Sequence, residues 1–229
     1  MSLADIQLQV ATWIQDTAGK LSPTDRDRAI AAAVETYSRH RPRLKQATLT
    51  GDGAAFDFAV PTDWMDGISS IIAIENPVDQ QRPEFLDESE YTVRLDPATG
   101  LSKIRFLADV LDNGEKAYLT YGIGHVLTTA LDTIPTGDRL AVIKLAAAGC
   151  ATQLAALYAQ TSDPTFGADT VNYRTKSQDY LALAKALETA YREHVGALAG
   201  VAAASVSSDL DVALQNNAGL PFYHDDLSR

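Results

Sequence analysis

An alanine-rich run at residues 136–160 constrains the fold of this chain more than any other stretch. Its larger apolar side chains recur every three or four residues, which is the period of a buried helix face. Because the positions between them are mostly alanine and glycine, this helix should be packed on several sides. We expect it at the centre of a helical bundle, and a second copy of the chain is one candidate neighbour. The positions predicted to be buried are Leu140, Ile143, Ala147, Cys150, Ala151, Leu154, Leu157 and Tyr158.

Three further helices are predicted around this one. The first begins at Ser2, with Asp5 three positions later in the manner of a capping box. The second begins at Ser22 and Pro23, because serine caps helices and proline fits their first position. The last covers residues 169–195, where apolar side chains again recur at helical spacing.

Residues 46–125 show the two-residue period of β-strands. A Gly-Asp-Gly turn predicts a hairpin within residues 46–60, and Asp-Pro-Ala-Thr-Gly predicts a second turn at 96–100. Strands at this spacing favour a small antiparallel sandwich or barrel between two helical parts. The other predicted strands cover residues 68–75, 91–95, 101–107 and 115–121.

The predicted fold class is α+β, mainly α: a helical bundle with an inserted small antiparallel β-sandwich or barrel and an extended C-terminal arm. The arm lacks helical or strand periodicity at its end, yet Leu220, Phe222 and Tyr223 would be unusual in a purely solvated tail. We therefore expect it to dock on something. The predicted divisions are residues 1–45 (N-terminal helices), 46–125 (acidic β domain), 126–195 (C-terminal helices) and 196–229 (arm).

The net charge of −11 is unevenly distributed. Residues 46–136 carry 5 basic and 15 acidic side chains, whereas residues 1–45 carry 7 basic and 5 acidic ones. An acidic surface repels phosphate, so we expect no tight binding of nucleic acid, although DNA could slide past such a surface. A basic cluster at the end of the second helix is open to two readings, a phosphate-binding patch or a solvated or subunit-pairing surface, and we favour the second. It consists of Arg39, His40, Arg41, Arg43 and Lys45.

The sequence has no motif typical of a nucleotide site, a zinc protease or a redox cysteine pair. His224 lies beside two aspartates, but on a tail without the rigid frame that a metal needs. The single cysteine, Cys150, is expected to be a buried apolar side chain. We predict no enzyme activity, no cofactor and no metal.

Neither a secretory signal nor a membrane span is predicted. Asp5 interrupts the N-terminal apolar residues, and the best candidate span, residues 136–160, contains Lys144 and Gln153. We expect folding in the cytoplasm and no membrane partner.

The order of these elements resembles the head-to-tail connector (adaptor) proteins of tailed bacteriophages, and the resemblance covers residues 1–195. Its motifs are packing patterns rather than catalytic signatures. The stretches that carry it are LSPTDRDRAIAAAVETYSRHRPR at 21–43, YLTYGIGHVL at 118–127 and LAALYAQTSDPTFGADTVNYRTKSQDY at 154–180.

The resemblance implies a structural virion protein of the neck, made in the host cytoplasm. Such proteins form a ring, commonly of twelve copies, beneath the portal protein. The ring extends the channel for double-stranded DNA, without specific binding, and offers a docking surface to the next neck or tail protein. A C-terminal arm often reaches the portal or an adjacent subunit. The residues expected at subunit or portal interfaces are Arg39, Arg41, Arg43, Leu220, Phe222 and Tyr223.

Two other classes of function compete with this one. The β insertion could be a carbohydrate- or peptide-binding module, which would be favoured by exposed aromatic side chains on one sheet face. A hydrolase with residues scattered along the sequence would need a deep pocket that holds a polar constellation. The aromatic residues to inspect are Trp64, Tyr91, Tyr118 and Tyr121.

Overall fold

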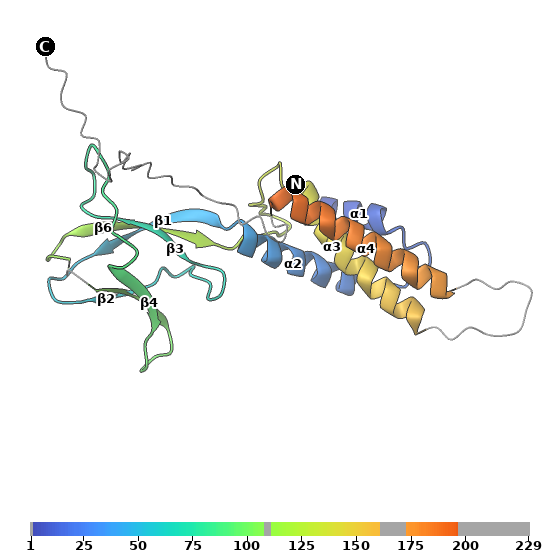
Figure 1. The fold of residues 1–229 in the computed structure, drawn as a ribbon, viewed down its shortest axis with the longest axis horizontal. Coiled ribbons are helices and arrows are strands. Elements are labelled where there is room, and N and C mark those ends of the chain that lie inside the picture. Colours follow the sequence, from blue (N-terminus) through green and yellow to red (C-terminus); the bar gives the residue numbers. More distant parts are fainter. Residues whose placement is uncertain (1, 108–110, 161–172, 197–229) are drawn as a thin grey trace, which may run out of the picture.

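The computed structural model describes residues 2–107, 111–160 and 173–196 of the 229-residue chain. Figure 1 shows helices gathered at one end of an elongated molecule and strands at the other. The fold is mixed α+β, with four helices and two small antiparallel sheets among the described residues, as the sequence predicts. The elements are α1 (Leu3–Ile14), α2 (Pro23–His40), β1 (Arg43–Thr50), β2 (Asp57–Ala59), β3 (Ile71–Glu75), β4 (Tyr91–Leu95), β5 (Ser102–Phe106), β6 (Lys116–Ile123), α3 (Arg139–Ala159) and α4 (Tyr173–Val195).

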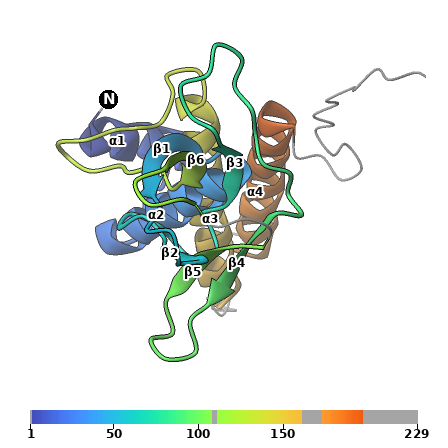
Figure 2. The same cartoon turned by 90° about the vertical axis from the view of Figure 1, so that its left-hand side faces the viewer.

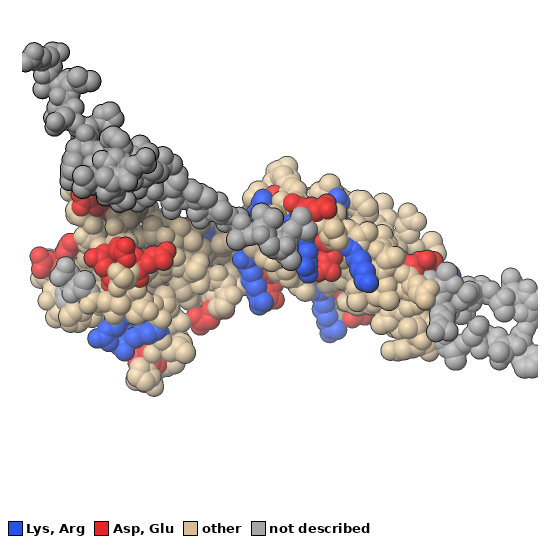
Figure 3. Space-filling view, in the orientation of Figure 1, with Lys and Arg blue, Asp and Glu red and all other residues tan. Residues whose placement is uncertain are grey.

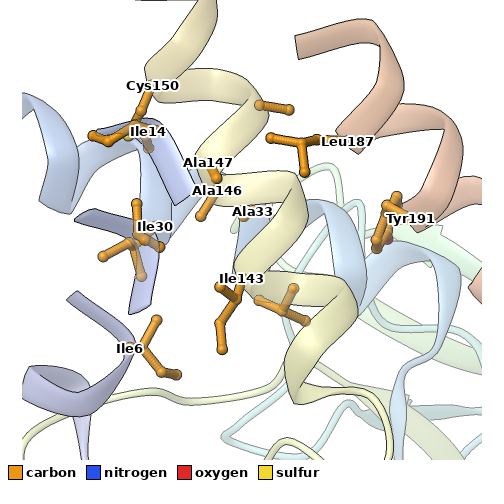
Figure 4. Close-up of a cluster of buried hydrophobic side chains, with 14 of the residues drawn as sticks. Ile6, Ile14, Ile30, Ala33, Ile143, Ala146, Ala147, Cys150, Leu187 and Tyr191 are labelled. Carbon is orange, nitrogen blue, oxygen red and sulfur yellow. The ribbon is translucent and has the colours of Figure 1, made fainter. Parts of the chain in front are cut away.

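Helix α3 is the centre of the bundle, because α1, α2 and α4 all pack against it. Its small side chains let these helices approach closely, and the core in Figure 4 joins residues from all four helices. The prediction of a central helix is confirmed. The core includes Ile6, Ile14, Ile30, Ala33, Ile143, Ala146, Ala147, Cys150, Leu187 and Tyr191.

Two predicted core positions on α3 are wrong. Leu140 is 50% exposed and Leu157 is 42% exposed. Three helices cover α3, so its buried surface is broader than one stripe, and small residues such as Ala146 and Ala148 are buried instead. The alanine content of α3 is therefore explained largely by packing within one copy of the chain.

By length and composition α3 is apolar enough to cross a membrane, which corrects the expectation from Lys144 and Gln153. The core helix of a bundle passes the same test, and α3 is covered by three other helices. Burial inside the bundle accounts for its apolar character.

The predicted helix starts are confirmed at two of the four helices. Ser2 accepts a hydrogen bond from the Asp5 amide, and Asp5 bonds back to the Ser2 amide, which completes the capping box of α1. Ser22 caps α2 by accepting from the Asp25 amide, with Pro23 at the first helical position. In both helices the capping serine and its partner aspartate lie within four consecutive residues, so the start can be recognised from a short stretch of sequence.

The strands form two three-stranded antiparallel sheets, with orders β1-β6-β3 and β2-β5-β4; Figure 2 views the molecule from the strand end, with the strands in front of the helices. A second apolar core lies between them, with residues from both sheets. The predicted hairpin at 96–100 is confirmed as the β4–β5 turn, in which Asp96 N donates to Leu101 O. The core residues include Leu49, Ile74, Ile104, Phe106, Ala117, Leu119, Tyr121 and Ile123.

The predicted hairpin within residues 46–60 is wrong. β1 pairs with β6, and β2 pairs with β5 in the other sheet. At the predicted Gly-Asp-Gly turn, Gly51 N donates to Glu115 O and Gly51 O accepts from Gly114 N. A Cβ atom on Gly51 would come within 2.4 Å of Asp112 O, so the chain here packs against the 111–115 segment and crosses between sheets. The glycine serves close approach rather than chain reversal.

Candidate functional site

A polar network occupies the junction where α2 ends, α3 begins and α4 ends. Its centre is the carboxylate of Asp138, which accepts hydrogen bonds from Tyr37 Oη at 2.5 Å and His194 Nε2 at 2.7 Å. Arg41 Nη1 lies 3.2 Å from both carboxylate oxygens, and Arg41 Nη2 donates to the His194 carbonyl. One carboxylate thereby ties together three helix ends that are far apart in the sequence.

The electrostatics of Asp138 favour the ionised form. Burial opposes ionisation, but the hydrogen bonds from Tyr37, His194 and Arg41 outweigh it and hold the pKa of Asp138 below its usual value. Burial and the bond to Asp138 raise the pKa of Tyr37, so Tyr37 stays a proton donor. Asp138 is also the N-cap of α3, yet its side chain makes no capping bond. The Asp138 carboxylate oxygens instead accept hydrogen bonds from Tyr37, Arg41 and His194.

His125 connects the end of β6 to the same junction. Its backbone amide donates to Ser38 Oγ at 2.8 Å, and its ring lies 4.9 Å from that of Tyr37. The ring nitrogens lie 3.0 Å from two carbonyl oxygens, those of Thr133 and Arg41. Nearby, His40 Nδ1 lies 2.7 Å from Tyr191 Oη, where burial raises the pKa of the tyrosine to about 12. Aromatic and polar contacts thus surround the two chain crossings between helices and strands.

Two glycines permit the close packing at these crossings. A Cβ atom on Gly122 would lie 2.9 Å from Pro42 Cβ, and one on Gly124 would lie 2.9 Å from Met65 Sδ. Neither glycine has a positive φ, so neither is required by backbone conformation. A side chain on Gly122 would push β6 away from the end of α2, because the Pro42 ring is rigid. A side chain on Gly124 would meet only the end of the flexible, half-exposed Met65 side chain, which can move.

The predicted interface arginines differ in their contacts within the chain. Arg39 Nη2 pairs with Glu35 Oε1 at 2.6 Å on the exposed side of α2. Arg41 binds Asp138 within its own chain, and Arg43 begins β1 opposite Ile123. Whether any of them meets a neighbouring subunit stays a prediction. Leu220, Phe222 and Tyr223 lie outside the described residues, as does the His224–Asp226 trio.

A groove of about 590 Å³ lies beside the junction, between α2 and the loops at 65–68 and 124–127. Its floor is apolar, with Ile30 and Val34 from α2. Asp27, Glu35 and Asp66 lie on its wall, and no lysine or arginine lines it. Ser38 and His125 also line the groove, but Ser38 Oγ donates to Val34 O and the His125 ring nitrogens lie 3.0 Å from backbone carbonyl oxygens, so these two side chains do not pair as nucleophile and base. The described residues contain no group of three or more side chains that could hold a metal ion.

The four aromatic residues that could have marked a carbohydrate site are not gathered on an open sheet face. Tyr121 is buried and donates to Asp63 Oδ1 at 2.6 Å, and Trp64 stacks on it. Tyr91 and Trp64 both pack against the core between the sheets. The Tyr118 hydroxyl lies 3.4 Å from both Asp79 carboxylate oxygens. These rings support the fold of the β part.

Sequence reasoning missed the Asp138 network, because its members come from three separate segments, at the ends of α2 and α4 and the start of α3. The only local signal was an aspartate before the first turn of the central helix, and that signal indicates an ordinary N-cap. Tyr37 and Tyr191 looked like core residues, and their hydroxyl partners lie 101 and 151 residues away in the sequence.

No family model matches this chain, and no curated protein matches it. Several chains of solved structures are similar to part of it, including the following two. The first, "Neck of empty GTA particle computed with C6 symmetry", is 14% identical over 76% of this chain and 87% of the other, with a TM-score of 0.27. The second, "Neck of native GTA particle computed with C12 symmetry", is 16% identical over 79% and 91%, with a TM-score of 0.26. TM-scores this low do not assign a fold or a function.

Proposed function

We propose that this chain is a structural, non-enzymatic component of a phage-like particle neck. In this proposal it is a head-to-tail adaptor, copies of which form a ring under the portal. The ring extends the DNA channel and presents a docking surface to the next neck or tail protein. The divisions at residues 45, 125 and 195 are part of the proposal, with the helical parts as ring body and the β part as an appended module.

The observation that carries the proposal is how the β part is inserted. Two N-terminal and two C-terminal helices, which flank it in the sequence, close into one bundle beside it, in the same element order on which the sequence resemblance rests. Both crossings are fixed, by the Asp138 network and by Pro42 against Gly122. A subunit of this kind can transmit a fixed orientation from its bundle to its β part, which a closed ring requires.

Charge supports the same assignment. Residues 46–136 carry 15 acidic and 5 basic side chains, and Figure 3 shows acidic side chains gathered over the β part. A strongly acidic surface near the channel would let DNA pass without binding. Arg39 and Arg43 remain the candidates for pairing with acidic groups on a neighbour, whereas Arg41 is engaged with Asp138.

The assembly state tests the proposal. We expect purified chain, mixed with a portal ring, to give one complex whose mass by native mass spectrometry contains many copies of the chain. Class averages viewed down the axis should show them around a central opening. A chain that stays monomeric with the portal, while turning over a small compound in a deep cleft, would overturn the proposal.

The arm is tested separately from the ring. Replacing Leu220, Phe222 and Tyr223 together by serine should abolish binding to the portal while the circular dichroism spectrum stays unchanged. Removing residues 205–229 should have the same result. If both variants bind the portal normally, the arm does not dock there.

A further inference from the structure

β4 is an edge strand whose outer side is unpaired among the described residues. It pairs with β5 alone, in the sheet order β2-β5-β4. Leu107 N donates to Glu90 O, and Asp96 N donates to Leu101 O, so the even-numbered residues of this stretch bond towards β5. By antiparallel geometry, Tyr91, Val93 and Leu95 direct their N–H and C=O groups to the outer edge.

The side chains at the same three positions are apolar, and two of them are exposed to solvent. Val93 is 41% exposed and Leu95 is 66% exposed. The register places Val93 opposite Ile104, which is fully buried, so both lie on the inner face of the sheet. The inner face therefore continues past the part that the other sheet covers.

The edge strand β1 of the other sheet is protected, by contrast. Lys45 lies at the same register parity as the buried Leu49, and its Nζ pairs with Asp63 Oδ2 at 2.5 Å. An inward-pointing lysine is a common way to prevent strand addition. β4 has no such charge on its inner face, which marks it as the edge built to accept a strand.

The outer face of the β2-β5-β4 sheet is basic within an otherwise acidic region. Arg94, Lys103 and Arg105 lie on it, and they are three of the five basic residues in 46–136. Their partners are two aspartates: Asp57 is shared by both arginines, and Asp96 pairs with Lys103. Three cations with two anions leave a positive excess, and a basic patch is visible at this position in Figure 3.

The C-terminal segment carries a complementary pattern at residues 209–214, Asp-Leu-Asp-Val-Ala-Leu. Leu210, Val212 and Leu214 alternate with Asp209 and Asp211, so an extended strand would be apolar on one face and acidic on the other. α4 ends at the junction beside the β part, since His194 binds Asp138 there. Twelve residues lie between Gly196 and Asp209, and these thirteen residue-to-residue steps allow a reach of about 43 Å.

We propose that residues 209–214 add as a fourth strand to the open edge of β4 in the same chain. Leu210, Val212 and Leu214 cover Val93 and Leu95 on the inner face, and the two aspartates lie beside Arg94 on the outer face. Backbone bonds supply the affinity and the alternation fixes which face points inward. The strand anchors the arm and leaves residues 215–229 free to reach a partner, so this inference stands whether or not the chain forms a ring.

Disulfide trapping in the full chain tests the face and the source of the strand. Val93→Cys is combined in turn with a cysteine at 210, 212 or 214, and, as controls, at 209, 211 or 213. Cys150 is a safe background, because burial raises the pKa of its thiol to about 11. We expect at least one even-numbered pair to cross-link within one chain, with about tenfold higher yield than any odd-numbered pair. Equal yields for both sets, or cross-links only between two copies, would overturn the proposal.

Hydrogen exchange gives an independent test. Val93→Pro removes an outward N–H and leaves the bonds to β5 intact, whereas Val93→Ala keeps the N–H. We expect the amides of residues 209–214 to exchange about tenfold faster in the proline variant than in the alanine variant. The amides of Thr92 and Arg94, which bond to β5, should be equally protected in both. If residues 209–214 exchange at the same rate in the two variants, no strand is added at β4.

Discussion

The bundle and the β part are stabilised in different ways. The bundle has one large apolar core in which small residues of α3 let three helices approach, and its sequence is nearly charge-neutral over residues 137–195, with 6 basic and 6 acidic side chains. The β part has a smaller core between two three-stranded sheets, a strong acidic excess and ion pairs on an outer face. The difference indicates two roles: the bundle is the rigid, apolar core of the molecule, and the β part carries most of its acidic surface.

The largest expected effect comes from the bundle core. Leu154→Ala should lower the free energy of unfolding by about 3 kcal/mol, because Leu154 is fully buried and truncation leaves a cavity. Leu140→Ala on the same helix should cost less than about 1 kcal/mol, because Leu140 is half exposed. Urea denaturation measures both. Equal losses would mean that Leu140 is buried in solution, for example by another copy.

The junction should show the next largest effect, and a pH dependence. Asp138→Asn should cost about 2 kcal/mol at pH 7, since Tyr37, Arg41 and His194 lose a charged acceptor. The pKa of Asp138 is lower in the folded chain than the usual value of an aspartate, 3.8, so its contribution is present above that value and is lost as the pH falls through the folded pKa. The gap between wild type and variant should therefore narrow in strongly acidic buffer. A gap that is constant with pH would show that charge at Asp138 is unimportant.

A glycine substitution separates close packing from general helix and strand effects. Gly122→Ala should cost about 1–2 kcal/mol, because the new methyl group meets Pro42 at 2.9 Å. Gly137→Ala is the control, since no atom lies within 4 Å of its Cβ position and its φ is not positive. Thermal unfolding compares the two. If Gly122→Ala is harmless, the contact between Pro42 and β6 does not fix the two regions together.

The smallest effect on the folded chain should come from surface charge. Replacing Arg39 and Arg43 together by glutamate should change the free energy of unfolding by only about 0.5 kcal/mol. The same change should weaken ring assembly, and more so at low salt, if these residues meet acidic groups on a neighbour. Arg192→Glu breaks a similar pair with Glu188 elsewhere and should leave assembly unchanged. Native mass spectrometry across a salt series would contradict the interface prediction if all forms assemble alike.

Local signals predicted the helices and one hairpin well. The hydrogen bonds of Ser2, Ser22 and the Asp96–Gly100 turn join residues a few positions apart, so these features can be predicted from short stretches of sequence. Strand pairing was less accessible: β1 pairs with β6, about 70 residues later, and the glycines at 51–53 look the same in a hairpin as in a crossing between sheets. The Asp138 network was hidden for the same reason, since periodicity cannot tell that Tyr37, Arg41 and His194 converge on one carboxylate.

The entry to the β part and the exit from it are direct neighbours, because Arg43 pairs with Ile123 at the start of β1 and the end of β6. The two ends of the intervening segment therefore lie side by side, so the segment connects the helices as one long loop would. Such a cassette can be lengthened, exchanged or shortened to a tight turn between Pro42 and Gly124 without re-routing the bundle. Evolution could thus have kept the scaffold and varied the appended piece to suit different partners.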